Sequence, residues 1–275
     1  MVLAADGSLD WERSFHYVDY FPALSSIEVH NNVQKEVGAK PVDFIAVPLK
    51  QTVWLWRSPE RQALIETRSN ASGEMELHYV PVAHLCQDQN GELHYDHAAW
   101  GDGFPLELWE DPNLAESREW LDGWHTEREW LEAVHRTRYS NGIIGIIEAL
   151  LIHPVADPYL ERKRELRAVD MIVFANDHWN FNVRGFNPGG NHGSFLRIST
   201  HSVLLFAGGR QTGIPRGERV ETPYDSFSFA PTILTLMGKP DPSMPGPVIH
   251  ELVAGGAHSP DDAGGVATSS AEIGK

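Results

Sequence analysis

Two histidines and an aspartate form the part of the sequence best suited to chemistry. Asp177 and His178 follow the run 170–175 (Asp-Met-Ile-Val-Phe-Ala) after one intervening residue, Asn176, and this run predicts a buried strand. His192 lies 14 residues beyond His178, in the glycine-rich stretch Pro-Gly-Gly-Asn-His-Gly-Ser. Carboxylate and imidazole groups bind Zn²⁺, Mn²⁺ and similar ions, and α/β folds present ligands at strand ends. A capping Asp beside a packed or surface His would give the same pair, but the second histidine favours a metal site.

The elements from 169 to 238 have a distinctive order. The order begins with a strand, the Asp-His pair and a loop with Asn-His-Gly. It continues with the run Val-Leu-Leu-Phe-Ala-Gly-Gly and ends with Ala-Pro-Thr-Ile-Leu-Thr-Leu-Met-Gly. This order resembles the C-terminal part of the alkaline phosphatase superfamily. The closest pattern is that of the type I phosphodiesterase/nucleotide pyrophosphatase branch, with the sulfatases nearby. The resemblance implies a metal-dependent hydrolase of phosphoric or sulfuric esters.

The resemblance also implies a ligand set. Two divalent metal ions are expected, Zn²⁺ first, with Mn²⁺, Mg²⁺ or Ca²⁺ as alternatives; Asp177 and His178 would bind one ion and His192 the other. An earlier Asp and Gly-His element of the family corresponds to Asp122 and His125, although their spacing is three where the family has four. A helix-proximal cap and an interfacial histidine explain this pair equally well. Arg197 is a candidate contact for the substrate oxyanion, with a solvated arginine as the alternative.

The family's nucleophile is missing from the pattern. In the family a strand near the N-terminus ends in a metal-binding Asp, and a Thr, Ser or formylglycine follows; residues 1–50 contain no such element, and 4–8 (Ala-Ala-Asp-Gly-Ser) lacks a preceding strand. The chain is therefore expected to represent the C-terminal portion, with a start that differs from that of its relatives. Two alternatives stay open: a non-catalytic, metal-binding fragment or remnant, and a metal hydrolase of unrelated fold with a water nucleophile.

Composition limits the partners. The 275 residues carry 22 Lys and Arg against 38 Asp and Glu, a net charge of −16 without a basic cluster, which excludes a nucleic-acid-binding surface. Two metal ions would offset the local carboxylates, so a small anionic ester remains an acceptable substrate. The single cysteine, Cys86, excludes an intramolecular disulfide and is expected to be a buried small residue. The start has no export signal and no run is long enough to span a membrane, so a cytoplasmic protein is expected if Met1 is the genuine start.

Local patterns predict the elements that must position these residues. They are a weak helix at 24–38, a strand at 42–49, an antiparallel β-meander over 50–97, a helical stretch from 116 to 151, a charged helix at 161–167, strands at 170–175 and 202–207, and a helix at 226–237. The expected fold is α/β. With the resemblance it becomes a partial alkaline-phosphatase-like three-layer sandwich with a β-meander insertion. The expected divisions are 1–41, 42–110, 111–253 and a disordered tail, 254–275.

Overall fold

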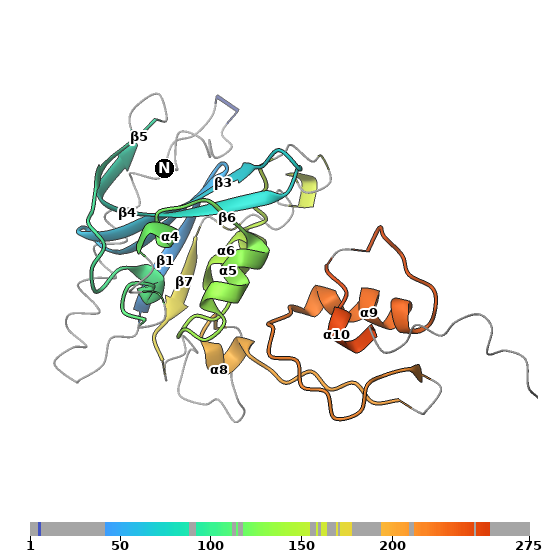
Figure 1. Cartoon of the computed structure of the whole chain (residues 1–275). Coiled ribbons are helices and arrows are strands. Elements are labelled where there is room, and N and C mark those ends of the chain that lie inside the picture. Colours follow the sequence, from blue (N-terminus) through green and yellow to red (C-terminus); the bar gives the residue numbers. More distant parts are fainter. Residues whose placement is uncertain are drawn as a thin grey trace, which may run out of the picture. The chain divides into compact units, whose positions relative to one another are not determined.

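The computed structural model describes residues 5–6, 42–87, 92–111, 114, 118–154, 158, 161–163, 169, 171–177, 194–208, 212–244 and 246–253. These residues form a mixed α/β structure in two compact units, 1–202 and 203–275 (Figure 1). The α/β class expected from the sequence is confirmed. The helix at 24–38, the loop at 185–193 and the tail at 254–275 lie outside the described residues, and of the charged stretch 161–167 only 161–163 is described, as helix.

A seven-stranded sheet forms the first unit. Its strands are β1 (Val42–Leu49), β2 (Thr52–Ser58), β3 (Arg61–Ser69), β4 (Met75–Gln87), β5 (Leu93–His97), β6 (His125–Thr126) and β7 (Ile172–Ala175). Their order is β5-β4-β3-β2-β1-β7, with β6 beside β5 on the same edge of β4. The predicted first strand, the meander and the strand before Asp177 are confirmed. Short turns join β1 to β4, so these neighbours must run antiparallel.

The direction of β7 departs from the expected family fold. β7 pairs antiparallel with β1, with Val42 opposite Ala175 and Ala46 opposite Ile172. All pairs among the described strands are antiparallel, whereas the alkaline phosphatase fold is built on a parallel sheet. The alkaline-phosphatase-like sandwich is therefore not confirmed. The meander and β7, expected in separate divisions of the chain, share one sheet.

Helices cover one face of this sheet. They are α4 (Arg118–Leu121), α5 (Glu127–Val134) and α6 (Gly142–Leu150), and their apolar residues join Phe44, Ile65 and Tyr79 in one core. The stretch from 116 to 151, expected to be helical, is thus interrupted. A capping box at Thr126 starts α5, and the left-handed conformation of Leu151 (φ 54°) ends α6. Such breaks leave the apolar spacing intact, which is why periodicity does not reveal them.

The predicted strand at 202–207 is wrong. Residues 201–208 have no regular secondary structure, and the side chains of Val203 and Leu205 are 82% and 84% exposed. An apolar run becomes a strand only where a neighbouring strand completes its hydrogen bonds. The short helix α8 (Arg197–Thr200) precedes this run.

The second unit contains the helix predicted at 226–237, which is confirmed. A 3₁₀ turn, η4 (Ser226–Ser228), leads into α9 (Phe229–Leu236), and Gly238 ends it with a φ of +68°. The buried Thr232 hydroxyl donates to the Ser228 carbonyl at 2.6 Å and accepts from the Ile249 N–H at 2.9 Å, which fastens α9 to the residue before α10 (His250–Val253). Within the described residues, no helix has the length and apolar character needed to cross a membrane.

Candidate functional site

Asp177 lies where the sequence predicts it, two residues beyond the last residue of β7. Its carboxylate is on the exposed surface, and its backbone N–H donates to the Asn176 side-chain oxygen at 2.9 Å. The β7 strand is held to β1 by stacking of Phe174 on Phe44, with ring centroids 4.5 Å apart. The predicted partners of Asp177, His178 and His192, lie outside the described residues.

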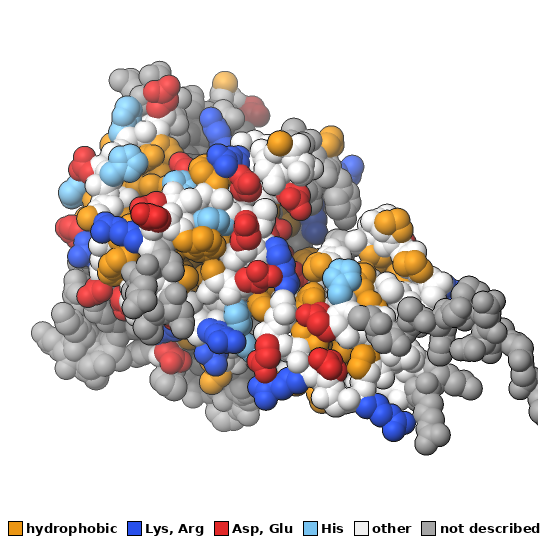
Figure 2. Space-filling view, viewed as in Figure 1, with side chains coloured by type: hydrophobic (Ala, Val, Ile, Leu, Met, Phe, Trp, Pro, Cys, Tyr) orange, Lys and Arg blue, Asp and Glu red, His pale blue; other side chains and the backbone are white. Residues whose placement is uncertain are grey.

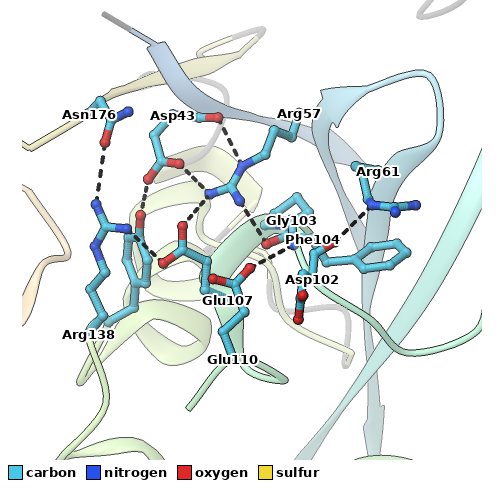
Figure 3. Close-up of polar contacts among 12 residues, drawn as sticks. Asp43, Arg57, Arg61, Asp102, Gly103, Phe104, Glu107, Glu110, Arg138 and Asn176 are labelled. Atoms are coloured by element: carbon cyan, nitrogen blue, oxygen red, sulfur yellow. Dashed lines mark hydrogen bonds and ion pairs between the residues drawn. The ribbon is translucent and has the colours of Figure 1, made fainter. Parts of the chain in front are cut away.

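A buried carboxylate lies on the neighbouring strand. Asp43 of β1 accepts a hydrogen bond from the Arg57 guanidinium (Figure 3). It also accepts one from the Tyr139 hydroxyl. Arg57 also donates to the Asp43 carbonyl at 3.2 Å and to the Phe104 carbonyl at 3.2 Å. The ion pair is therefore fixed by backbone acceptors as well as by the carboxylate.

Glu107 extends this network to the end of β7. One carboxylate oxygen lies 3.2 Å from Arg57 and the other 2.7 Å from Arg138. Arg138 in turn donates to the Asn176 side-chain oxygen at 3.3 Å, as Figure 3 shows. A continuous chain of polar contacts thus joins the buried Asp43 to the residue that precedes Asp177.

An unusual backbone segment presents Glu107. Within the 3₁₀ turn η2 (Pro105–Glu107), Leu106 and Glu107 have φ values of 66° and 48°, which non-glycine residues seldom adopt. Such residues cost roughly 1–3 kcal/mol each and persist only where their surroundings hold them. Here Leu106 is buried in the core, and the Tyr79 hydroxyl donates to the Pro105 carbonyl at 2.5 Å. The segment is therefore held from both the apolar and the polar side.

Burial and neighbouring charges set the protonation of the network. Burial raises the pKa of Asp43, against the opposing effect of Arg57, and Glu107 raises it further. For Arg138 partial burial favours the neutral form, but the hydrogen bond to Glu107 and the charges of Glu107, Asp43 and Asp177 prevail and raise its pKa. Arg138 thus stays cationic, and with a side chain 41% exposed it is the surface end of the network.

The structure does not bring Asp122 and His125 to the same place as Asp177. Asp122 accepts a hydrogen bond from the Trp100 indole, and His125 donates from Nε2 to the Trp120 carbonyl at 2.6 Å. The His125 ring also stacks on Trp120, with centroids 3.8 Å apart. Its strand β6 lies five strand spacings from β7, each about 4.8 Å. These contacts are those of an interfacial histidine and do not fit a site shared with Asp177.

Arg197 begins α8 and is exposed, and its guanidinium donates to the Arg136 carbonyl at 2.9 Å. Its backbone N–H donates to the Arg138 carbonyl at 2.7 Å. In the part of the chain that the structure describes, no three Asp, Glu, His or Cys side chains converge as a metal site. Of the sequence-predicted metal ligands that the structure describes, Asp177 is the one that lies at the end of β7.

An open hollow lies elsewhere, on the β4–β5 hairpin, and holds His84, Cys86, His94 and Asp96. His84 Nδ1 lies 3.0 Å from an Asp96 carboxylate oxygen. Cys86 is exposed, so the expectation that it is buried is wrong; it points away from the core because the adjacent Leu85 points inward. The hollow includes neither Asp177 nor the network of Asp43.

Comparison of the chain with protein-family models, with curated proteins and with solved structures found no match. The resemblance to the alkaline phosphatase superfamily therefore stays a prediction from sequence order. On the face seen in Figure 2, described Lys and Arg side chains lie scattered among Asp and Glu, without a separate basic area.

Sequence reasoning missed the four charged members of the network: Asp43, Arg57, Glu107 and Arg138. One signal was present for Asp43, because a carboxylate inside the otherwise apolar run Val-Asp-Phe-Ile-Ala-Val requires a buried partner. No local signal identifies Glu107 or Arg138, which are 31 residues apart and meet only through the turn of η2.

Proposed function

We propose that the chain belongs to a metal-dependent hydrolase of phosphoric or sulfuric esters, with Asp177, His178 and His192 as metal ligands. The observation that carries the proposal is the position of Asp177. An exposed carboxylate lies two residues beyond the end of a strand, in the order that the superfamily resemblance predicts, and a cationic Arg138 contacts the residue between. In metal-dependent hydrolases of anionic esters, bound metal ions and cationic side chains stabilise the negative charge of the reacting group.

Residues at the end of β7 and in the buried network would have different roles in the proposed reaction. Divalent ions bound there would activate a nucleophile and neutralise the oxygens of the ester during displacement. Asp177 supplies a hard oxygen ligand, and its link to Asn176 fixes the backbone from which it projects. The Asp43–Arg57–Glu107 contacts hold the strand end from the side of the core.

The proposed superfamily fold is a three-layer sandwich with a parallel sheet, which the described strands do not form. The proposal therefore rests on the site residues and their order along the chain. Asp122 and His125 are left out of it, since their contacts lie at the opposite end of the sheet.

Turnover of chromogenic esters tests the proposal. The full chain, supplied in turn with Zn²⁺, Mn²⁺, Mg²⁺ and Ca²⁺, is assayed with p-nitrophenyl phosphate, bis(p-nitrophenyl) phosphate and p-nitrophenyl sulfate. Hydrolysis is expected to require metal and to fall at least about a hundredfold in His178→Ala and His192→Ala. His97→Ala, which removes an exposed histidine of β5, is the matched control and keeps full activity.

The alternative of a non-catalytic metal-binding module predicts a different result. It is favoured by residues 1–50, in which no nucleophile motif is found. In that case metal binds in a manner that depends on His178, yet none of the three esters is hydrolysed. Hydrolysis that is unchanged in both histidine variants contradicts the proposed site.

A further inference from the structure

The exposed end of the polar network is a single guanidinium. Arg138 Nη1 donates to Glu107 Oε2 at 2.7 Å and Nη2 donates to Asn176 Oδ1 at 3.3 Å. A guanidinium carries five N–H donors in one plane, and these are the two that bond to described residues. With 41% of its side chain exposed, Arg138 can offer its other donors to a solute.

We propose that Arg138 binds the phosphoryl or sulfuryl oxygens of the substrate, and that Arg197 positions it. This inference rests on the proposed function. It names the residue that recognises the anionic group and replaces the sequence-based assignment of that role to Arg197.

The contacts of Arg138 suit this role. Arginine binds tetrahedral oxyanions through two parallel N–H groups, which demands a fixed plane. Glu107 fixes the plane from one side, and it is itself held by Arg57 at 3.2 Å. On the other side Arg138 contacts Asn176, the residue before Asp177. The cation therefore lies at the end of β7, where the expected metal ligand is found.

The contacts of Arg197 suit a supporting role. Its guanidinium is engaged by the Arg136 carbonyl, and its N–H holds the carbonyl of Arg138 itself at 2.7 Å. One turn further along, Thr200 and Ser140 are joined by a hydroxyl contact of 2.7 Å. Helix α8 thus holds the backbone of Arg138 in place through hydrogen bonds, while the Arg197 guanidinium is occupied by the Arg136 carbonyl.

Binding of inorganic phosphate and sulfate to the full chain tests the inference without turnover. Isothermal titration calorimetry is performed on metal-loaded and metal-free samples of the wild type, Arg138→Gln and Arg138→Lys. Phosphate affinity is expected to fall about tenfold to a hundredfold in Arg138→Gln, because a charge-assisted, two-point contact is lost. Arg138→Lys retains a point charge but lacks the paired N–H groups of the guanidinium, so its phosphate affinity should lie between those of the wild type and Arg138→Gln.

Arg68→Gln is the matched control. Arg68 of β3 is paired with Glu76 at 2.7 Å and its side chain is 51% exposed, so it resembles Arg138 in pairing and exposure but lies on a strand, whereas Arg138 lies in the turn between α5 and α6. Its replacement should leave phosphate affinity unchanged. An equal fall in Arg68→Gln, an unchanged affinity in Arg138→Gln, or wild-type protein that binds neither anion overturns the inference.

The positioning role of Arg197 is tested by a double-mutant cycle. Arg197→Ala removes the guanidinium contact with the Arg136 carbonyl and keeps the backbone N–H to Arg138. It should weaken phosphate binding in the wild-type background and have no further effect in Arg138→Gln, because the guanidinium acts through Arg138. Additive losses contradict that role. Metal content measured on the same samples separates the two proposals. If the protein retains metal but Arg138→Gln binds phosphate normally, only the inference about Arg138 is refuted. If the protein holds no metal, the proposed function is refuted, and the titration of metal-free protein decides whether Arg138 binds the anion.

Discussion

Removing the buried carboxylate of Asp43 should destabilise the protein far more than removing a surface carboxylate. The side chains of Asp43 and Arg57 are 5% and 19% exposed, so the Asp43→Ala variant leaves a guanidinium confined below the surface. Losing one partner of a buried pair costs roughly 3–5 kcal/mol. Glu107 at 3.2 Å and two backbone carbonyls still contact Arg57, which places the expected loss near the lower end, at about 3 kcal/mol.

Two further variants isolate the cause. Asp43→Asn keeps the shape and an acceptor for one of the two donors but still leaves Arg57 without its counter-charge, so its loss should be intermediate, at about 1–3 kcal/mol. Glu132→Ala removes an exposed pair with Arg128, whose side chains are 50% and 33% exposed, and should cost no more than about 0.5 kcal/mol. Urea unfolding at neutral pH, followed by tryptophan fluorescence, gives each free energy of unfolding.

The pH dependence has a defined sign. Burial raises the pKa of Asp43 in the folded protein above 3.8, so between 3.8 and the raised value the folded state binds more protons than the unfolded state. The stability linked to protonation of Asp43 is then fully present below 3.8 and is lost as the pH rises through that window, while the ion pair with Arg57 remains at neutral pH. The free energy of unfolding of the wild type should therefore rise relative to that of Asp43→Asn as the solution is acidified. Equal losses in Asp43→Ala and Glu132→Ala at neutral pH would refute the reasoning.

Two other predictions concern the helices that cover the sheet, and both are measured by urea unfolding. Thr126→Ala removes one half of the capping box of α5 and should cost about 1 kcal/mol. Hydrogen bonds from Thr126 lower the pKa of Glu129, so this stabilisation is present above the ordinary pKa of 4.5 and is lost as the pH falls through the lowered pKa. A cost of Thr126→Ala that grows on acidification would contradict this reasoning. Gly145→Ala would place a methyl group 2.6 Å from a Phe195 ring carbon and should cost about 1–3 kcal/mol despite the better helix propensity of alanine; a stabilised variant would show that the ring moves aside freely.

The sheet could be predicted where its signals are local. The turn at Asn70, whose side-chain oxygen accepts the N–H groups of Ser72 and Glu74, is read directly from residue types, and the meander follows from such turns. The direction of β7 could not be predicted, because its partner β1 lies more than a hundred residues earlier and the apolar run 170–175 suits either direction. The run at 202–207 shows the same limit, since its composition favours a strand that has no described partner.

The candidate site divides in the same way. Asp177 could be placed because a carboxylate after an apolar strand lies at the strand's end whatever the topology. The spacing between Asp122 and His125 could not show that each side chain is hydrogen-bonded to a tryptophan residue. Arg138 was not identifiable at all, because its role depends on Glu107, which reaches it through a backbone turn with positive φ angles.

Bound metal is the most direct test of the central claim. The full chain is equilibrated with Zn²⁺ or Mn²⁺, freed of unbound ions, and analysed for metal by elemental mass spectrometry, alongside His178→Ala, His192→Ala and the control His97→Ala. The wild type and the control should retain metal in proportion to protein, and each of the other two variants should retain less. Equal metal content in all four proteins, or none in the wild type, would contradict the account.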